Sequence, residues 1–425
     1  MLITRWSRCE IDVRLGAVLS ERSCRVCGGD LRRVLDLGRQ PVSNAFVKAE
    51  ESGKVPFFQL AVGLCTSCTM VQQLDEVPPN EMYRADYPYR ASGSALIRRH
   101  GEEVARHIMR ACPGRGDRFV VEIGSNDGVM LKTLSEAGIR HLGVDPAAGA
   151  GEVARQQGIN VRTDFFNAPT AGEIREEHGP AHLIYSANTI SHISYLDSIF
   201  QGAATLLSPD GLFVFEDRYL GDILKQVYFD QIYDEHIYLF SVRSVQATAA
   251  RFGFDLVDVE HLPLHGGSIR YTVARPGTSA PTATVAEFLA REEAEGIAEE
   301  ETFVRFAANI DRIRADLVKL LRDLRSDGRR VVGYGATSRS ATVMNYCDIG
   351  PDLLPMVCDS TPEKQGRLTP GSQIPVCPPE VFSHPYPDYA LLFAWNHAEE
   401  IMAKERAFQE QGGRWILYAP DVHLV

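Results

Sequence analysis

The chain has 425 residues, of which 44% are hydrophobic and 24% are charged, a composition typical of a globular protein with two or three domains. Its formal net charge of -12 at pH 7 disfavours binding to nucleic acid, because the phosphate backbone repels an acidic surface. No apolar run reaches the length of a signal peptide or the roughly 20 residues that span a bilayer. We therefore expect a soluble, cytoplasmic, monomeric protein with no nucleic-acid or membrane partner.

Two C-x-x-C pairs lie near the start of the chain, Cys24 with Cys27 and Cys65 with Cys68. Each C-x-x-C turn directs two thiolates at one point, and two such turns complete a tetrahedron around Zn²⁺. Four thiolates fill the coordination shell, so the zinc is predicted to be structural and to stabilise a small domain, residues 1–80. The other cysteines show no pairing pattern and are interpreted as packing residues.

A strand–turn–helix pattern opens the middle region, which we take as residues 81–280. The apolar run 119–123 leads into the turn Gly-Ser-Asn-Asp-Gly at 124–128 and then into a helical stretch, as in the first unit of a doubly wound sheet. Later strands are expected at 141–145, 160–164, 182–188 and 212–216, the last after a turn at 209–211. His100 and His107, in an amphipathic helix before this pattern, are expected to be exposed to solvent.

Acidic and polar residues lie at the carboxyl ends of these expected strands, where such sheets bind ligands. Acids on both sides of the turn suit a cofactor without phosphates, and S-adenosylmethionine carries a sulfonium cation. A glycine turn without a ligand is the alternative. The residues predicted to bind this cofactor are Glu122, Gly124, Asn126, Asp127, Asp145, Asp164, Phe165 and Asn188.

The segment 229–241 reads FDQIYDEHIYLFS and places Tyr233, Asp234, Glu235 and His236 among large apolar residues. From the residues alone, a buried structural network and a proton-transfer site explain it equally well.

A second strand–turn–helix unit lies in the region 281–425. A helix is expected first, with one apolar stripe made of Phe303, Phe306, Ile310, Ile313, Leu317, Leu320 and Leu324. The run 329–334 then leads into Gly335, Ala336, Thr337 and Ser338. Hydroxyl and backbone N–H groups at a helix N-terminus favour an anion, so this loop fits phosphate.

The order of these motifs resembles one family, over nearly the whole chain. The cysteine quartet, the Gly124 loop, the FDQIYDEH segment, the His265-Gly-Gly turn and the Gly335 loop occur together in S-adenosylmethionine-dependent sugar C-methyltransferases of antibiotic deoxysugar pathways. The resemblance implies an α/β fold: a small N-terminal zinc-binding module, a central Rossmann-like methyltransferase domain and a C-terminal Rossmann-like domain. It also implies a dTDP-linked 4-keto deoxysugar as substrate, held by the C-terminal domain.

The site residues that the resemblance implies fall into two groups. The reaction site would contain His236, Tyr233, Glu235, His192 and Tyr87. The residues predicted to bind the sugar nucleotide are Tyr334, Gly335, Ala336, Thr337, Asp359 and Asn396.

The expected chemistry is methyl transfer to C-3 of the sugar through an enolate, because the 4-keto group acidifies the neighbouring C–H bond. His236 would be the base, because histidine titrates near neutrality. Glu235 would orient it, and Tyr233 and His192 would donate hydrogen bonds to the C-4 oxygen. Four alternatives stay open: methylation at C-5, a nicotinamide-dependent oxidoreductase that uses the Gly335 loop, a nucleic-acid methyltransferase, and a non-catalytic sugar-nucleotide binder.

Overall fold

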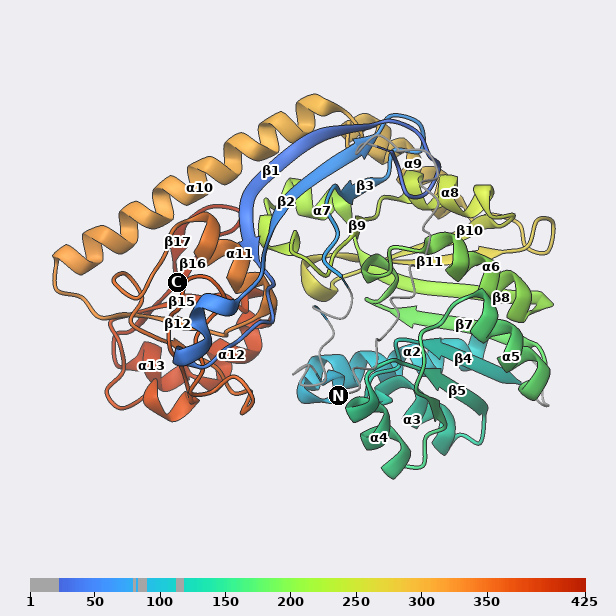
Figure 1. Cartoon of the computed structure of the whole chain (residues 1–425), viewed down its shortest axis with the longest axis horizontal. Helices are drawn as coiled ribbons and strands as arrows, with labels where there is room; N and C mark the ends of the chain where they lie inside the picture. The colour runs from blue at the N-terminus through green and yellow to red at the C-terminus, as the bar shows by residue number, and fades with distance from the viewer. Residues whose placement is uncertain (1–22, 79–81, 83–89, 112–117) are drawn as a thin grey trace, which may run out of the picture.

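The computed structural model describes residues 23–78, 82, 90–111 and 118–425. These residues form three β-sheets, and Figure 1 shows the second and third sheets as separate bodies bridged by the first. Among the described residues, no helix is both long and apolar enough to cross a membrane.

The first sheet is antiparallel and joins the N-terminal region to the middle of the chain. Its order is β1-β2-β3-β9, with bounds β1 Leu31–Pro41, β2 Phe57–Cys65, β3 Val71–Gln73 and β9 Tyr238–Leu239. The short strand β9 directly follows the FDQIYDEH segment. That segment is therefore held in part by the N-terminal region, although it lies more than 150 residues further along the chain.

The second sheet has the doubly wound pattern expected from the Gly124 turn. Its order is β10-β11-β8-β7-β4-β5-β6, with bounds β4 Phe119–Ile123, β5 Arg140–Val144, β6 Val161–Arg162, β7 Ala181–Ala187, β8 Leu207–Arg218, β10 Asp255–Leu262 and β11 Ser268–Ala274. Strands β4 to β8 are parallel to one another, and β10 and β11 add an antiparallel edge. The strand order reverses between β4 and β7, where such sheets bind their ligands.

Helices accompany this sheet on both faces (Figure 1). Their bounds are α2 Ala95–Ala111, α3 Val129–Glu136, α4 Ala148–Gln156, α5 Ala168–His178, α6 Leu196–Leu206, α8 Val242–Arg251 and α9 Ala283–Glu295. The short helix α7 (Leu220–Lys225) packs instead in the core that the first and third sheets share. Short, largely buried apolar strands explain why the strand predicted at 119–123 matches β4 and the one predicted at 182–188 differs from β7 by one residue at each end.

The third sheet is a smaller Rossmann-like sheet with the order β14-β13-β12-β15-β16-β17. The bounds are β12 Val331–Tyr334, β13 Val357–Cys358, β14 Val376–Cys377, β15 Tyr389–Leu392, β16 Arg414–Leu417 and β17 His423–Leu424, with α11 Ser338–Tyr346, α12 Ala398–Lys404 and α13 Arg406–Glu410. The long helix α10 (Glu300–Ser326) runs along the outer side of β1 and of this sheet (Figure 1). It packs into a core shared by the first and third sheets.

Three details differ from the sequence-based predictions. The apolar stripe of α10 uses Leu321, which is fully buried, whereas Leu320 is only partly buried. Residues 209–211 are not a turn before the fifth strand but a bulge within β8, since Ala181 pairs with Leu207 and Leu183 pairs with Leu212. His100 on α2 is not solvated; its Nε2 lies 2.6 Å from Oε2 of the buried Glu216.

The expected domain boundaries at residues 80 and 280 stay predictions. β9 of the middle region belongs to the first sheet, and α10 of the C-terminal region packs on that sheet. The three regions therefore share a sheet and a hydrophobic core.

Candidate active site

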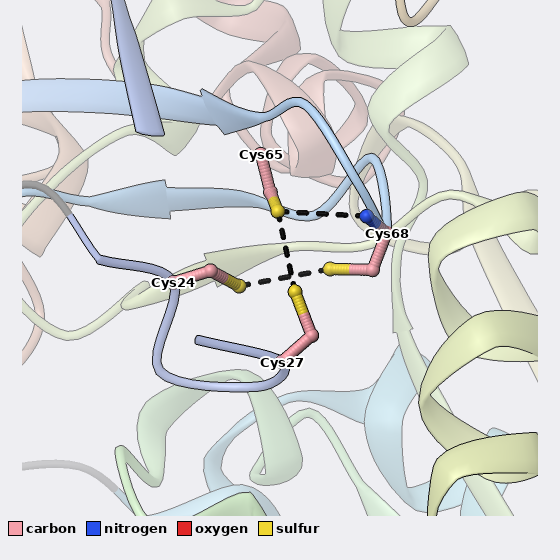
Figure 2. Close-up of side chains that lie close together, drawn as sticks. All are labelled: Cys24, Cys27, Cys65 and Cys68. Atoms are coloured by element: carbon pink, nitrogen blue, oxygen red, sulfur yellow. Dashed lines mark hydrogen bonds between the residues drawn. The ribbon is translucent and has the colours of Figure 1, made fainter. Parts of the chain in front are cut away.

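The four predicted zinc ligands converge between β2 and β3 (Figure 2). Their sulfur atoms all lie within 4.8 Å of one another, with 3.6 Å from Cys24 to Cys68 and 3.4 Å from Cys27 to Cys65. A tetrahedral Zn²⁺ with Zn–S bonds of about 2.3 Å needs sulfur–sulfur separations of about 3.8 Å, so this quartet fits the metal.

Hydrogen bonds orient the sulfur atoms of these cysteines. Gln72 Nε2 donates to Cys24 Sγ at 3.0 Å, and backbone N–H groups donate to the sulfurs of Cys27 and Cys65. The bond with Cys68, and after it the backbone bonds and the Gln72 bond, lower the pKa of Cys24 to about 5. The bond with Cys24 and then burial raise the pKa of Cys68, and burial raises that of Cys65. The N–H donors orient and neutralise thiolate ligands.

The Gly124 turn joins β4 to α3 and requires its glycine. Gly124 has φ of 73°, and a Cβ on it would lie 2.3 Å from Thr189 Oγ1. Asn126 also has a left-handed backbone, with φ of 47°. The chain therefore passes very close to the end of β7, as a cofactor-binding turn at a switch point requires.

The acids around this turn have distinct roles. Both oxygens of Asp145 accept backbone N–H groups, from Asn126 and Ala147, each at 2.8 Å; a carboxylate can still accept further bonds from a ribose diol. Asp127 is occupied by Ser92, whose hydroxyl donates to it at 2.6 Å. Asp127 thus ties the segment before α2 to the turn, and its predicted contact with the cofactor competes with that bond.

Glu122 differs from these two acids because its Oε2 is buried with no partner among the described residues. Burial, and then the nearby acids Asp145, Asp127 and Glu216, raise its pKa well above the usual range. An unpartnered buried carboxyl group calls for a ligand or a cation. The Oδ1 atom of Asn188, at the end of β7, is likewise buried and unpartnered.

The remaining predicted cofactor residues lie just after β6. Asp164 accepts from Arg162 at 3.0 Å, and Phe165 keeps 45% of its surface exposed. A large exposed aromatic ring beside the carboxyl ends of parallel strands is suited to stack on a flat base. Together with the unpartnered atoms of Glu122 and Asn188, these residues fit S-adenosylmethionine.

The FDQIYDEH segment lies where the three sheets meet. Gln73 of β3 donates through Nε2 to the carbonyl oxygens of Tyr233 at 2.6 Å and His236 at 2.8 Å. Thr342 of α11 donates to the carbonyl of Ile232 at 3.1 Å. Hydrogen bonds from β3 and from α11 thus hold the backbone of this segment, although it contains no long helix or strand. They fix the positions of its side chains.

The two predicted histidines lie together in this junction, with ring centroids 5.2 Å apart, and the Tyr233 ring lies 4.1 Å from that of His236. His236 Nδ1 contacts the carbonyl oxygen of Gln231, so Nδ1 carries the proton and Nε2 carries a lone pair. The Nε2 atoms of His236 and His192 are both buried and unpartnered among the described residues.

Burial changes the titration that the sequence suggested for these groups. It lowers the pKa of His192 to about 3 and that of His236 well below 6.5, with a further contribution from the charge of Arg218. Burial raises the pKa of Tyr233. At neutral pH both histidines are therefore neutral, and the titration near neutrality that their residue type predicts is wrong for them. Each imidazole keeps a lone pair.

Two acids of the segment are bound by the N-terminal region. Asn44 Nδ2 donates to Glu235 Oε1 at 2.6 Å, and the backbone N–H of Ser43 donates to Asp234 Oδ1 at 3.1 Å. Asn44 Oδ1 also accepts from Ser338 at the start of α11, at 3.1 Å. Sequence reasoning missed Asn44, because a single asparagine in a loop carries no signal for a contact 191 residues away.

The Gly335 loop has the geometry of an anion site. Gly335 has φ of 87°, and Thr337 caps α11 by accepting the Ser340 N–H at 3.2 Å. The Ala336 carbonyl accepts from Lys364 Nζ at 2.8 Å, which brings an ammonium group to the loop. Thr342 of the same helix holds the FDQIYDEH segment, so this loop and the two histidines belong to one junction.

The other residues predicted to bind the sugar nucleotide lie in different surroundings. Asp359 is buried and caps a turn through Thr361, and Asn396 Oδ1 accepts from Arg339. The side chain of Tyr334 lies in an aromatic core and donates to Glu405 at 2.8 Å, so only its backbone faces the loop. Tyr87 lies outside the described residues.

Comparison with known proteins finds a relative that matches nearly the whole chain. A C-methyltransferase, NovU, of Streptomyces niveus is 36% identical over 410 residues, which cover 95% of this chain and 96% of NovU. The chain belongs to this C-methyltransferase family. Three family models match in succession: "Putative zinc binding domain" at 24–83, "Methyltransferase domain" at 96–259 and "C-methyltransferase C-terminal domain" at 263–420. The predictions of an enzyme, of its α/β fold, of S-adenosylmethionine and of zinc are confirmed.

Solved structures resemble less than half of the chain. A SAM-dependent methyltransferase of Anabaena variabilis ATCC 29413 matches at 18% identity, with 46% of this chain and 91% of that chain covered and a TM-score of 0.36. Magnesium protoporphyrin IX methyltransferase (ChlM) of Synechocystis PCC 6803 with bound SAM matches at 12%, covering 42% and 79%, with a TM-score of 0.32. The family assignment rests on the relative that spans the chain.

Proposed function

We propose that this C-methyltransferase methylates C-3 of a dTDP-linked 4-keto deoxysugar in the cytoplasm. The observation that carries the proposal is the junction itself. A buried imidazole, that of His236, has an Nε2 atom without a partner among the described residues. It packs beside His192, which follows the strand end that the Gly124 turn approaches, and its segment is bound by the helix that follows the loop suited to phosphate. S-adenosylmethionine would supply a methyl group on a sulfonium centre, and Glu122, Asp145, Phe165 and Asn188 would hold it.

Each residue of the junction would have a separate role in proton removal. His236 Nε2 would take the proton from the carbon next to the ketone, because its tautomer leaves a lone pair there. Glu235, held by Asn44, would stabilise the imidazolium that forms. The neutral Tyr233 hydroxyl would donate a hydrogen bond to the ketone oxygen. His192 would donate a second hydrogen bond to that oxygen or relay the proton.

The Gly335 loop would bind the diphosphate part of the substrate. Its residues Gly335, Ala336 and Thr337 supply backbone N–H groups and a hydroxyl at a helix N-terminus. Asp359 and Asn396 are proposed to contact the nucleoside, and Tyr87 to complete the reaction site. Membership of a C-methyltransferase family supersedes the nicotinamide-dependent alternative.

The test is methyl transfer from labelled S-adenosylmethionine to a dTDP-4-keto-6-deoxyhexose, with NMR of the product. A new methyl group at C-3 is expected; a methyl group at C-5 would select the alternative position. His236→Ala is expected to lose both methyl transfer and exchange of the C-3 proton with D₂O. His182→Ala, at an exposed position at the other end of β7, is the matched control, and near-normal turnover of His236→Ala would remove His236 as the base.

A further inference from the structure

Arg218 is a largely buried cation, with 13% of its side chain exposed. It ends β8, beside Tyr219 and opposite Ser268 of β11. Its Nε and Nη1 atoms are both buried and have no hydrogen-bond partner among the described residues. A guanidinium group that is largely removed from water and has two unpartnered donor atoms is costly, so such a group in a native fold indicates an anion that arrives later.

The acid nearest to Arg218 does not satisfy it. Asp217 Oδ1 lies 3.9 Å from Arg218 Nη1, beyond hydrogen-bond distance. The carboxylate of Asp217 is occupied by Ser191, whose hydroxyl donates at 2.6 Å and whose backbone N–H donates at 3.0 Å. Asp217 therefore holds the turn that carries His192, while the guanidinium donors beside it stay available.

Arg218 lies at the reaction site and not at the nucleotide loop. Its positive charge acts to lower the pKa of His192, Tyr233 and His236, although burial raises the pKa of Tyr233 overall. The charge of Arg339 acts in the same direction on Tyr233 and His236, but less strongly than that of Arg218. The nucleotide loop has cations of its own from the third sheet, Lys364 on the Ala336 carbonyl and Arg339 on Asn396. Phosphate charge can thus be met without Arg218.

We propose that Arg218 is a catalytic residue that binds the ketone oxygen next to the carbon to be methylated, and holds the negative charge that this oxygen acquires. This inference rests on the proposed function. As His236 takes the proton, the C–H electron pair forms a C=C bond and the C=O π pair moves to oxygen. The C=O bond then re-forms while the carbon takes the methyl group from the sulfonium, which becomes a neutral thioether, and the proton passes from His236 to solvent.

Arginine fits this task better than the neutral donors nearby. It stays fully charged at any working pH, whereas Tyr233 and His192 are neutral there. A fixed positive charge in a dry site stabilises an oxyanion more than the ketone from which it forms, so it lowers the barrier to proton removal. The neutral side chains then orient the oxygen, and Arg218 carries the charge.

The experiment follows proton exchange separately from methyl transfer. A dTDP-4-keto-6-deoxyhexose is incubated in D₂O with S-adenosylhomocysteine, and C-3 deuteration is measured by NMR for the wild type, Arg218→Ala and Arg218→Gln. Exchange and methyl transfer are expected to fall about 100- to 1000-fold in Arg218→Ala, with dTDP and S-adenosylhomocysteine affinities unchanged within threefold. Added guanidinium ion is expected to restore part of both rates. Arg275→Ala is the control, because within the described part of the chain its guanidinium donates to the backbone carbonyls of Ala204 and Leu207.

The outcomes separate the role of Arg218 from the proposed function of the enzyme. Normal exchange in Arg218→Ala, or weakened dTDP binding with an unchanged kcat, would overturn the role of Arg218 alone. If Arg218→Ala does not fold, Arg218→Gln decides the matter, because it keeps hydrogen-bond donors but removes the charge: wild-type exchange in Arg218→Gln would overturn the role of Arg218. A wild type that neither exchanges nor methylates would overturn the proposed function, and this inference with it.

Discussion

Asn44 offers the sharpest test of how the N-terminal region contributes to catalysis. Its amide donates to Glu235 at 2.6 Å and accepts from Ser338 at 3.1 Å, so one side chain links all three parts of the junction. A hydrogen bond to a charged group contributes about 1.5–3 kcal/mol. If Glu235 must be held to stabilise the His236 imidazolium, that free energy is lost from the transition state. Since about 1.4 kcal/mol corresponds to a tenfold change in rate, Asn44→Ala should lower kcat roughly 10- to 150-fold.

The assay is steady-state methyl transfer with a dTDP-4-keto-6-deoxyhexose, together with calorimetric binding of S-adenosylhomocysteine. Affinity for S-adenosylhomocysteine should not change, because Asn44 does not contact the Gly124 turn. Ser338→Ala is the matched control: it removes the other bond of Asn44 and leaves the bond to Glu235, so a smaller effect is expected. A folded Asn44→Ala enzyme with kcat within twofold of the wild type would refute the idea that this bond supports proton transfer.

Three further outcomes can be measured. Cys68→Ala should release the zinc, which a colorimetric chelator quantifies, and lower the melting temperature, because a site with three thiolates binds zinc more weakly. Gly124→Ala should weaken S-adenosylhomocysteine binding at least tenfold, since its Cβ would meet Thr189 Oγ1 at 2.3 Å, whereas Gly138→Ala, with φ of 70° but open space around it, should not. His192 stays neutral in the fold down to pH about 3 but takes up a proton below about 6.5 when unfolded. Stability is therefore lost as pH falls from 6.5 towards 3, and His192→Gln should show a smaller drop in its urea midpoint between pH 7 and pH 4.5.

Local patterns predicted the parts of the molecule that local physics determines. The C-x-x-C pairs, the glycine turn and the short apolar strands each require particular residues within a few positions, so they can be recognised without tertiary information. The apolar stripe of α10 was placed correctly except for Leu320, because a stripe that drifts around the helix can pass to Leu321.

Contacts between distant segments could not be predicted in this way. Asn44 and Glu235 are 191 positions apart, and Gln73 and Tyr233 are 160 apart; neither pair leaves a periodic or compositional trace. Arg218 did leave one, since a charged residue that follows the apolar run of β8 lies at the carboxyl end of a parallel strand. The histidine pKa values also depend on burial, which the residue type alone does not reveal.

The zinc site and the reaction site are mechanically connected, although the metal has no open coordination position. Cys65 ends β2 and Cys68 precedes β3, so the metal fixes where β3 begins. Strand β3 pairs with β9, and its last residue, Gln73, binds the backbone carbonyls that flank Glu235. Loss of zinc should therefore displace the general base before the sheets unfold. Mild chelation is expected to lower kcat while S-adenosylhomocysteine binding persists, because the Gly124 turn belongs to a different sheet; simultaneous loss of both would show that zinc supports only global stability.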